Sequence, residues 1–505
     1  MEAFVTCFRP EGGSVRSLEK DTLLGSLLER VSEHPAKVAL RCGGESLTYE
    51  RYMARILSAA ARLRSLGVAE EDRVLVSAPN GLPVSILYFA IHALGAIAVP
   101  VAPDTIDMTM AALANDCGAR LAVLDRAPAG MGCRVATPSE VTAPGTESVA
   151  PVCRRGSIAD ILYTTGTTGK KKGAVLTQAS VFAAARNMTE FIGTEGEDVE
   201  VAPLPLSHSF GLGRLRSLAL AGHTLAIERG VGNGGPVIKS LIEHRATGLA
   251  MVPAGFDILR QVTGDALGHA GDRLRYVEIG SAPLRPNTRA WLLEMLPKAR
   301  ICHHYGLTEA SRAAFTECHA DPAKTGTGKA SPNVSIAICD ENLNRLGPRQ
   351  SGEIVVQGDM VMREYWNRPE LTRDALCAWG LRTGDIGYLD GEGHLFLLGR
   401  RCDLINVGGR KVVPDEVEEE LRLMDGVRDA ACVGEPDPLL GEHVKAFVVA
   451  DRPLNLAAVA AFLQPRIEAY KIPRTLELAA HVPRTSSGKP QRNLLRARPA
   501  AGGVA

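Results

Sequence analysis

A segment rich in glycine, threonine and lysine has the composition of a phosphate-binding loop. It reads "YTTGTTGKKKGAVLT" and covers residues 163–177. Glycines let backbone N–H groups curl around an anion, while threonine hydroxyls and lysine side chains add donors and positive charge. A Walker-type loop needs the pattern G-x-x-x-x-G-K-[ST], whereas Gly166 and Gly169 lie only three residues apart and Lys170 is followed by Lys171. The spacing therefore argues against a P-loop NTPase and favours another kind of polyphosphate cradle, with a solvated basic loop as the alternative.

Four further motifs follow this loop along the chain. They read "YGLTEA" (305–310), "RTGDIGYLD" (382–390), "GRRCDLINVGGRKVVPDEVEE" (399–419) and "PRTSSGKPQR" (483–492). In order and spacing, the five motifs resemble the signature motifs of the ANL superfamily of adenylate-forming enzymes. That family comprises acyl- and aryl-CoA synthetases, adenylation domains of nonribosomal peptide synthetases and firefly-type luciferases. The segments "HALGAIAVPVAP" and "SGEIVVQGDMVMREYWNRPELT" are also similar to family segments, so the resemblance covers nearly the whole chain.

The resemblance implies a two-step reaction on a carboxylic acid. The carboxylate attacks the α-phosphate of ATP to give acyl-AMP and pyrophosphate, and a thiol then displaces AMP. Two anions must be brought together, so positioning and electrostatic stabilisation should dominate the catalysis. The implied cofactors and substrates are ATP, Mg²⁺ and coenzyme A. An acyl carrier protein remains the alternative acceptor, and a nucleotide-binding descendant without activity is the third class considered.

The resemblance implies nucleotide-binding residues in several motifs. The phosphate contacts fall on Thr164, Thr165, Gly166, Thr167, Thr168, Gly169 and Lys172, the adenine-side loop on Gly280, Ser281, Ala282 and Pro283, and the adenine and ribose contacts on Tyr305, Asp385 and Arg400. The family usually has proline at the position of Lys171. Because proline would have fixed φ, lysine there adds charge and loosens the loop. We expect nucleotide binding to survive this departure.

Four residues are implied to act in catalysis: Lys489, Thr308, Glu309 and His208. Lys489 matches the lysine that bridges the acyl carboxylate and the ribose and α-phosphate region of ATP. Thr308 matches a phosphate-contacting hydroxyl, and Glu309 matches the magnesium ligand, since a carboxylate with phosphate oxygens and waters suits Mg²⁺. His208 matches the residue at the mouth of the acyl pocket, with a structural histidine as its alternative reading.

The resemblance also implies that the small domain rotates between the two steps. Gly408 and Gly409 would then help to form the tunnel for the thiol. The family hinge is usually Asp or Lys, whereas this chain has Cys402 there, followed by Asp403. A hinge needs tolerance of φ/ψ change rather than a particular chemistry. Either residue could therefore absorb the torsion.

The acyl pocket is implied to include Phe210, Gly211, Gly213, Phe256 and His303. The segment "SHSFG" lacks the aspartate by which amino-acid-activating relatives hold an ammonium group, which weighs against an amino-acid substrate. Asp257 could still serve that purpose. An aryl, polycyclic or medium-chain acid remains open. Arg214 and Arg216 are unusual in this segment; we expect them to face solvent, with the acid and a phosphopantetheine phosphate as alternatives.

The elements that must position these residues indicate an α/β fold. Strand patterns at 73–79, 96–101, 119–125, 246–253 and 275–280 alternate with helical patterns such as 83–95, which is typical of parallel sheets covered on both faces. The segments 351–358 and 393–400 look instead like antiparallel strands. Past Arg400, helical patterns at 412–424 and 455–469 flank strands at 429–435 and 443–451. We predict a large multi-subdomain N-terminal AMP-binding domain with parallel and mixed sheets, residues 1–400, and a small mobile α+β C-terminal domain, 401–505, carrying the catalytic lysine.

Composition excludes several classes of function. The chain of 505 residues has 57 basic and 57 acidic side chains, so no net charge points to nucleic acid or to an anionic membrane. The eleven cysteines are scattered and odd in number, which indicates reduced thiols and a cytoplasmic location. The apolar stretch 85–103 holds His92, Gly95 and Pro100, so a helix followed by a buried strand explains it better than a membrane span. We expect a monomer or a homodimer.

Overall fold

The computed structural model describes residues 19, 21–165, 171–232, 234–320, 326–484 and 490–496, without the side chains of Thr165, Cys402 and Lys411. The chain divides into two compact units. The first combines residues up to Ile336 with Val356–Leu381, and the second combines Ala337–Val355 with the chain from Arg382 onward. The predicted domain border after Arg400 stays a prediction.

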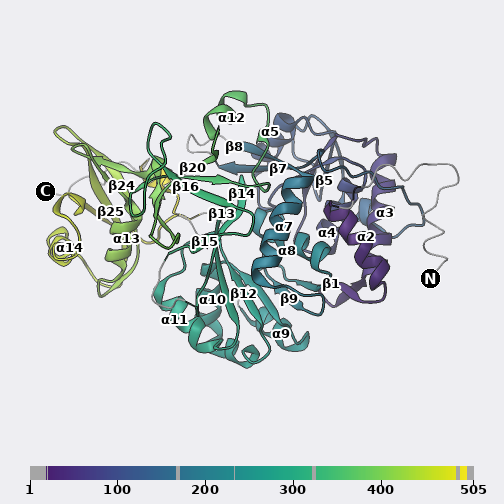
Figure 1. Ribbon diagram of the computed structural model, residues 1–505, viewed down its shortest axis with the longest axis horizontal. Coiled ribbons are helices and arrows are strands. Elements are labelled where there is room, and N and C mark those ends of the chain that lie inside the picture. Colours follow the sequence, from purple (N-terminus) through teal and green to yellow (C-terminus); the bar gives the residue numbers. More distant parts are fainter. Residues whose placement is uncertain are drawn as a thin grey trace. The chain divides into compact units, whose positions relative to one another are not determined.

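The larger sheet of the first unit has nine strands (Figure 1). In spatial order they are β15 (Lys329–Ala330), β14 (Ala310–Glu317), β13 (Arg300–Leu307), β12 (Tyr276–Ile279), β11 (Gly248–Met251), β9 (Val199–Ala202), β10 (Thr224–Ile227), β1 (Val38–Cys42) and β2 (Glu45–Thr48). Neighbours from β13 to β1 pair in parallel, whereas β14, β15 and β2 pair antiparallel at the two sides. Every residue of β10, β11 and β12 is buried, as expected for parallel strands covered on both faces.

A second sheet of this unit has seven strands. Their order is β18 (Glu364–Tyr365), β8 (Lys171–Thr177), β7 (Ile158–Thr165), β4 (Ile97–Pro100), β3 (Arg73–Ser77), β5 (Leu121–Leu124) and β6 (Arg134–Ala136). The pairs from β7 to β6 are parallel, whereas β8 pairs antiparallel with both β7 and β18. The predicted strands 73–79, 96–101 and 119–125 are thus confirmed as β3, β4 and β5.

The helices of the first unit cover these sheets. They are α2 (Leu23–Glu33), α3 (Tyr49–Ser65), α4 (Leu82–Ala93), α5 (Asp107–Cys117), α6 (Pro138–Thr142), α7 (Gln178–Ile192), α8 (Ser209–Ala221), α9 (Gly235–Glu243), α10 (Pro253–Thr263), the 3₁₀ helix η1 (Ala266–Ala270), α11 (Pro286–Met295) and α12 (Pro369–Ala375). Helices α7 and α8 pack side by side (Figure 1). The apolar stretch 85–103 forms α4 and the buried strand β4, as predicted. No helix in the described part of the chain is long and apolar enough to cross a membrane.

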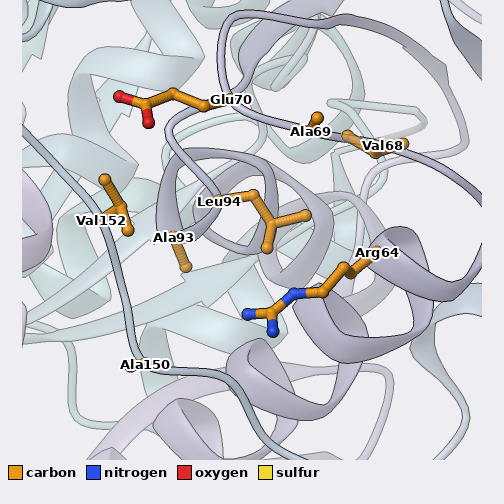
Figure 2. A pocket seen from close by; sticks show the side chains of 8 residues that line it. All are labelled: Arg64, Val68, Ala69, Glu70, Ala93, Leu94, Ala150 and Val152. Carbon is orange, nitrogen blue, oxygen red and sulfur yellow. The ribbon is translucent and has the colours of Figure 1, made fainter. Parts of the chain in front are cut away.

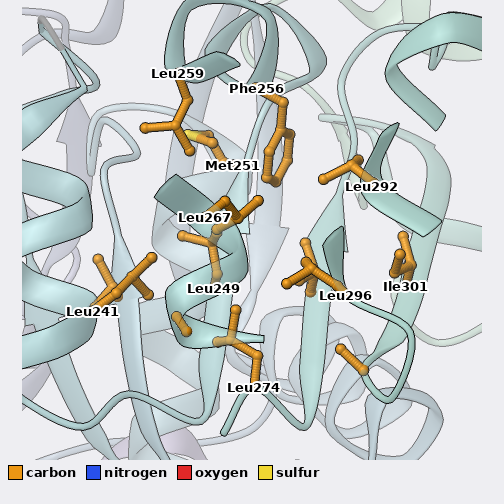
Figure 3. Close-up of a cluster of buried hydrophobic side chains, with 14 of the residues drawn as sticks. Leu241, Leu249, Met251, Phe256, Leu259, Leu267, Leu274, Leu292, Leu296 and Ile301 are labelled. Atoms are coloured by element: carbon orange, nitrogen blue, oxygen red, sulfur yellow. The ribbon is translucent and has the colours of Figure 1, made fainter. Parts of the chain in front are cut away.

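A large apolar core lies where α9, α10 and α11 meet the larger sheet. Its members come mainly from these helices and from β11, β12 and β13; Leu249, Met251, Phe256, Leu259, Leu292 and Ile301 are among them (Figure 3). The Phe256 ring is fully buried in this cluster. Its predicted place in the wall of the acyl pocket therefore stays a prediction, while its contribution to the core is evident.

Helix α8 is tied to both sheets by buried arginines. Arg214 donates to Glu200 on β9, from Nε to Oε1 at 2.7 Å, and from Nη1 to Glu278 Oε2 on β12 at 2.9 Å. Arg216 donates from Nε to the Tyr88 hydroxyl at 2.9 Å and from Nη2 to Asp160 on β7. The side chains of Arg214 and Arg216 are 0% and 1% exposed. The expectation that they face solvent was wrong, because buried carboxylates on β9, β12 and β7 neutralise their charge.

The second unit contains a sheet with the order β23 (Arg410–Val412), β22 (Ile405–Val407), β25 (Gly441–Ala450) and β24 (Val427–Asp437), with β26 (Thr475–Leu478) also paired to β25. With it come α13 (Pro414–Arg422), α14 (Leu456–Leu463), α15 (Arg492–Arg496) and the 3₁₀ helices η2 (Arg401–Asp403) and η3 (Ala469–Lys471). The strands predicted at 429–435 and 443–451 are confirmed. The helix predicted at 455–469 ends early, at Leu463, since Pro465 lacks the N–H that would continue the helical hydrogen bonding.

One more sheet has the order β16 (Ser335–Cys339), β17 (Gly352–Gln357), β20 (Gly380–Leu389) and β19 (Leu376–Cys377), with β21 (Leu395–Arg400) paired to β20. The pairing of β20 with β21 is antiparallel. The predicted strands 351–358 and 393–400 thus exist as β17 and β21. The fold class predicted from the sequence, mixed α/β with a small α+β part, is confirmed.

Candidate functional site

The Gly/Thr/Lys segment forms an antiparallel hairpin whose tip is the predicted phosphate loop. Strands β7 and β8 pair Thr164 with Lys172 and Thr165 with Lys171. The predicted contacts Gly166, Thr167, Thr168 and Gly169 lie outside the described residues. The Thr164 Oγ1 atom is buried and has no hydrogen-bond partner among the described groups. An unsatisfied hydroxyl next to such a loop suits a site for an oxygen-rich anion.

The motif "YGLTEA" forms a second hairpin. Leu307 at the end of β13 pairs with Ala310 at the start of β14, so Thr308 and Glu309 are the two residues of the turn. The backbone C=O of Glu309 accepts a hydrogen bond from the N–H of Met362 at 2.8 Å. Tyr305 is buried on β13, opposite Ala314. The turn thus presents a hydroxyl and a carboxylate together from a rigid hairpin.

The two hairpins bring Lys172 and Glu309 together. Lys172 Nζ lies 3.3 Å from Glu309 Oε1, and Glu309 is only 6% exposed. Tyr365 on β18 completes the group: its hydroxyl donates to Glu309 Oε1 at 2.7 Å and accepts a hydrogen bond from Lys172 Nζ. Lys172 Nζ also lies 4.1 Å from the centroid of the Tyr365 ring. Sequence reasoning placed Lys172 and Glu309 in separate motifs, and the structure shows them in contact.

The predicted adenine-side loop follows β12 directly. A Cβ at Gly280 would lie 2.0 Å from the His304 ring, so only glycine fits there. Ser281 has φ of +74°, a left-handed conformation that is uncommon for a non-glycine residue. His303 Nε2 lies 3.2 Å from the Ala282 carbonyl oxygen. Pro283 is exposed at the turn that follows.

The predicted acyl-pocket residues of α8 pack against a side chain that the motifs did not indicate. A Cβ at Gly213 would lie 2.3 Å from Nη1 of Arg312, and Nη2 of Arg312 donates to the Phe210 carbonyl at 3.1 Å. A Cβ at Gly211 would clash with the Pro205 carbonyl at 2.2 Å. His208 is exposed and is the N-cap residue of α8. The Arg312 guanidinium therefore packs directly against the backbone of α8 at Phe210 and Gly213.

Buried charges around Glu278 give this region its electrostatics. Burial alone would raise the pKa of Glu278, but attraction to Arg312 and Arg214 outweighs burial and holds that pKa below its usual range. His304 Nδ1 lies 3.0 Å from Glu278 Oε1, and burial lowers the pKa of His304. Burial also lowers the pKa of His303 to about 4. Both imidazoles are therefore neutral near pH 7, and the cations of this region are guanidinium groups.

The predicted ribose contacts meet in the second unit. Asp385 on β20 lies opposite Arg400 on β21, and Arg400 Nε is 3.2 Å from Asp385 Oδ1. Asp385 is 5% exposed, and its backbone N–H donates to the Thr383 hydroxyl at 3.1 Å. A carboxylate and a guanidinium fixed side by side on paired strands can offer an acceptor and a donor to neighbouring sugar hydroxyls.

The predicted thiol-tunnel glycines form the tight turn between β22 and β23. Gly408 and Gly409 have φ of +58° and +84°, and the flanking residues Val407 and Arg410 are paired. The Gly408 N–H donates to the Leu440 carbonyl at 2.8 Å. Both glycines are thus required by the left-handed backbone of the turn.

Lys489 lies outside the described residues, but the base of its loop is described. Arg484 and Pro490 form an antiparallel bridge, and the Gln491 side-chain Nε2 donates to the Arg484 carbonyl at 2.7 Å. Arg492, three positions after Lys489, donates to Glu418 Oε1 at 2.7 Å and to Asp403 Oδ2 at 3.2 Å. The loop thus starts and ends at fixed points, one of them bound to the predicted hinge residue Asp403.

Comparisons with known proteins identify the family. The family model described as AMP-binding enzyme matches residues 27–366, and the model described as AMP-binding enzyme C-terminal domain matches residues 416–489. The chain belongs to the AMP-binding enzyme family. This membership confirms the predicted ANL superfamily and the predicted enzyme class, an adenylate-forming acid–thiol ligase.

Similar proteins cover almost the full length of this AMP-binding enzyme. A long-chain-fatty-acid–CoA ligase of Mycobacterium tuberculosis is 30% identical, covering 89% of this chain and 92% of its own. A feruloyl-CoA synthase of Amycolatopsis is 30% identical over 92% and 96% of the two chains. Among solved structures, ATP-bound MatB from Rhodopseudomonas palustris matches with a TM-score of 0.88 at 27% identity, over 94% and 98% of the chains.

The residues around Glu309 have the chemistry that a magnesium ion would need. Mg²⁺ prefers oxygen ligands, takes one or two carboxylates and completes its shell with phosphate oxygens and waters. Glu309 offers one buried carboxylate, and its Oε1 already faces the cationic nitrogen of Lys172. The residues present therefore fit a single protein ligand to a nucleotide-bound cation.

Three residues of this region were missed by the sequence reasoning: Tyr365, Arg312 and Glu278. Tyr365 lies within "SGEIVVQGDMVMREYWNRPELT", a segment that resembles the family, but no chemistry was assigned to it. Arg312 is a single charged residue shortly after "YGLTEA", among small and apolar residues. Such a lone charge in an apolar strand is a usable signal of a buried ion pair.

Proposed function

We propose that this enzyme activates a carboxylic acid with ATP to give acyl-AMP and pyrophosphate, and then transfers the acyl group to coenzyme A. The observation that carries the proposal is the contact between Lys172, next to the predicted phosphate loop, and Glu309, the predicted magnesium ligand. Two motifs distant in sequence meet in one small site, as a polyphosphate with its cation requires. Relatives described as CoA ligases support coenzyme A as the acceptor.

Each group of residues has a part in this proposal. Thr164, Thr165, Lys172 and the loop tip hold the phosphates, and Glu309 holds Mg²⁺, which would neutralise phosphate charge. Tyr305 with the loop 280–283 holds adenine, Thr308 contacts phosphate, and Asp385 with Arg400 holds the ribose. Lys489 draws the acyl carboxylate to the α-phosphate, and Gly408 with Gly409 lines the path of the thiol.

The acid is proposed to enter past His208 toward Phe210, Gly211, Gly213 and His303. The proposed substrate is an aryl, polycyclic or medium-chain acid. We propose a cytoplasmic location, since the nine cysteines whose side chains the structure describes are free thiols. We also propose that the enzyme is a monomer or a homodimer.

The test is pyrophosphate release with a panel of carboxylic acids, repeated with coenzyme A and with a phosphopantetheinylated carrier protein. We expect acid-dependent pyrophosphate release, and AMP plus acyl-CoA when coenzyme A is added. Acyl transfer to the carrier protein but not to coenzyme A would favour the alternative acceptor. An absence of pyrophosphate with every acid would support a nucleotide-binding protein without ligase activity.

The hinge gives a separate prediction. Residues 401–403 form the 3₁₀ helix η2, and proline at Cys402 would fix φ there. If the torsion at this position separates the two half-reactions, Cys402→Pro should reduce thioester formation more than ATP–pyrophosphate exchange. The matched control is Cys402→Ser, which keeps backbone freedom and should retain both rates. Equal losses of both rates in Cys402→Pro would contradict a hinge role.

A further inference from the structure

A short segment of the first unit connects the two halves of the predicted phosphate site. We call residues 361–368 the strap. On one side the strap pairs with β8: the N–H of Arg363 donates to the Val175 carbonyl and the N–H of Trp366 to the Gly173 carbonyl, both at 2.8 Å. On its other side the N–H of Met362 donates to the Glu309 carbonyl at 2.8 Å. The strap is thus hydrogen-bonded to the strand that leaves the phosphate loop and to the turn that carries Glu309.

The side chain of Tyr365 also connects β8 with the turn that carries Glu309. Tyr365 is 5% exposed, and its hydroxyl bonds to Lys172 on β8 and to Glu309 in the turn. Because Lys172 Nζ lies both 3.3 Å from the Glu309 carboxylate and over the Tyr365 ring, its position is fixed by two independent contacts. A hydroxyl that donates to one partner and accepts from the other can orient both at once.

A second branch of the strap reaches the strand that enters the loop. Arg368 Nη2 donates to Asp116 Oδ1 at 2.6 Å, and the Trp366 indole N–H donates to the Asp116 carbonyl at 3.2 Å. The other carboxylate oxygen of Asp116 accepts from the Tyr163 hydroxyl at 2.6 Å. Tyr163 immediately precedes Thr164 of the predicted cradle. The strap therefore braces both strands of the β7–β8 hairpin.

We propose that Tyr365 is the positioning residue of the phosphate site, and that Lys172 is the counter-cation of Glu309 while no nucleotide is bound. This inference rests on the proposed function. Binding of ATP with its cation would supply phosphates to Lys172 and a new cation to Glu309, so the Lys172–Glu309 contact is exchanged for contacts to the ligand. Tyr365 holds the side chains of Lys172 and Glu309 where each can bind its part of the incoming nucleotide and cation. Mutation of a residue that is hydrogen-bonded to a metal ligand commonly lowers the affinity for the metal about 10- to 100-fold.

The first experiment measures ATP binding without any acid, as a function of Mg²⁺ concentration. Tyr365→Phe should raise the half-saturating Mg²⁺ concentration about 10-fold, because Glu309 loses the hydroxyl that orients it. The matched control is Tyr49→Phe. Tyr49 lies on α3, and its buried hydroxyl donates to the His223 carbonyl at 2.7 Å. That control should leave the Mg²⁺ dependence unchanged. An equal Mg²⁺ dependence in the two variants would overturn the proposal.

The second experiment needs no ligand and no turnover. In the nucleotide-free enzyme, the melting-temperature losses of Tyr365→Phe and Lys172→Met should add less than fully in the double variant, since each removes the hydrogen bond between Lys172 and Tyr365. Tyr49→Phe combined with Lys172→Met should give additive losses. Fully additive melting-temperature losses of Tyr365→Phe and Lys172→Met would overturn the proposal. If the wild-type enzyme binds no ATP, the proposed function fails, and this cycle still decides whether Tyr365 positions Lys172.

Discussion

Lys489→Ala should lower the rate of acyl-AMP formation by about 10²–10³-fold and leave thioester formation from preformed acyl-AMP much less affected. The physical reason is the repulsion between the acyl carboxylate and the α-phosphate, which one well-placed ammonium group offsets. Removal of a single preorganised charge-stabilising donor costs a rate factor of that size. The measurement is ATP–pyrophosphate exchange for the first step, and release of AMP from synthetic acyl-AMP and coenzyme A for the second.

The structure supports a local effect for this substitution. The base of the loop is closed by the Arg484–Pro490 bridge and by the contacts of Arg492, none of which involves the Lys489 side chain. The matched control is Lys298→Ala, which removes an exposed lysine paired with Asp272 at 2.7 Å and should change neither rate. Loss of both half-reactions to the same degree would show that Lys489 supports folding or both steps, rather than adenylation.

Local patterns were sufficient to predict much of the fold. The apolar runs within the segments 96–101 and 119–125 form the buried parallel strands β4 and β5, because a strand covered on both faces has no polar side. Turn chemistry was equally informative at Gly408 and Gly409, whose positive φ values only glycine adopts readily. Such strands and turns depend on residues that are close together in the chain, so they can be predicted from one sequence.

Contacts between distant segments could not be predicted in the same way. Arg214 and Arg216 were expected in solvent, because an isolated arginine is costly to bury and nothing nearby in sequence neutralises it. Their partners Glu200, Glu278 and Asp160 lie on strands of two different sheets. The Lys172–Tyr365–Glu309 group is similar, since its three members come from three separate motifs. Motif resemblance indicated which segments approach the nucleotide, but not which side chains touch.

Arg214→Met should destabilise the enzyme by about 3–5 kcal/mol. The substitution keeps the apolar stem but removes the guanidinium. Among the described groups, the buried Glu200 carboxylate then keeps one donor, the Tyr276 hydroxyl on β12, 2.8 Å away. Breaking a buried pair by removing one partner has a cost of this size, because the other charge stays out of water. Glu278 is affected less, since Arg312 still binds it at 3.0 Å. Thermal and urea unfolding of the apoenzyme measure the loss.

The control is Arg126→Met, which removes the same charge from an exposed arginine bonded to Asp107 at 2.7 Å and should cost less than about 1 kcal/mol.

The unpaired Glu200 carboxylate of Arg214→Met also predicts a pH dependence. Burial already raises the pKa of Glu200 in the wild-type protein, and loss of Arg214 removes the attraction that opposes burial. When the pKa of a carboxyl group is higher in the folded protein than in the unfolded chain, the free energy of unfolding falls as pH rises through that range. The loss of stability in Arg214→Met should therefore be smaller near about pH 5 than near about pH 8. Glu200→Gln added to Arg214→Met should recover part of the loss at the higher pH, because it removes the unpaired charge. A deficit independent of pH, with no recovery in the double variant, would mean that Arg214 stabilises α8 through packing alone.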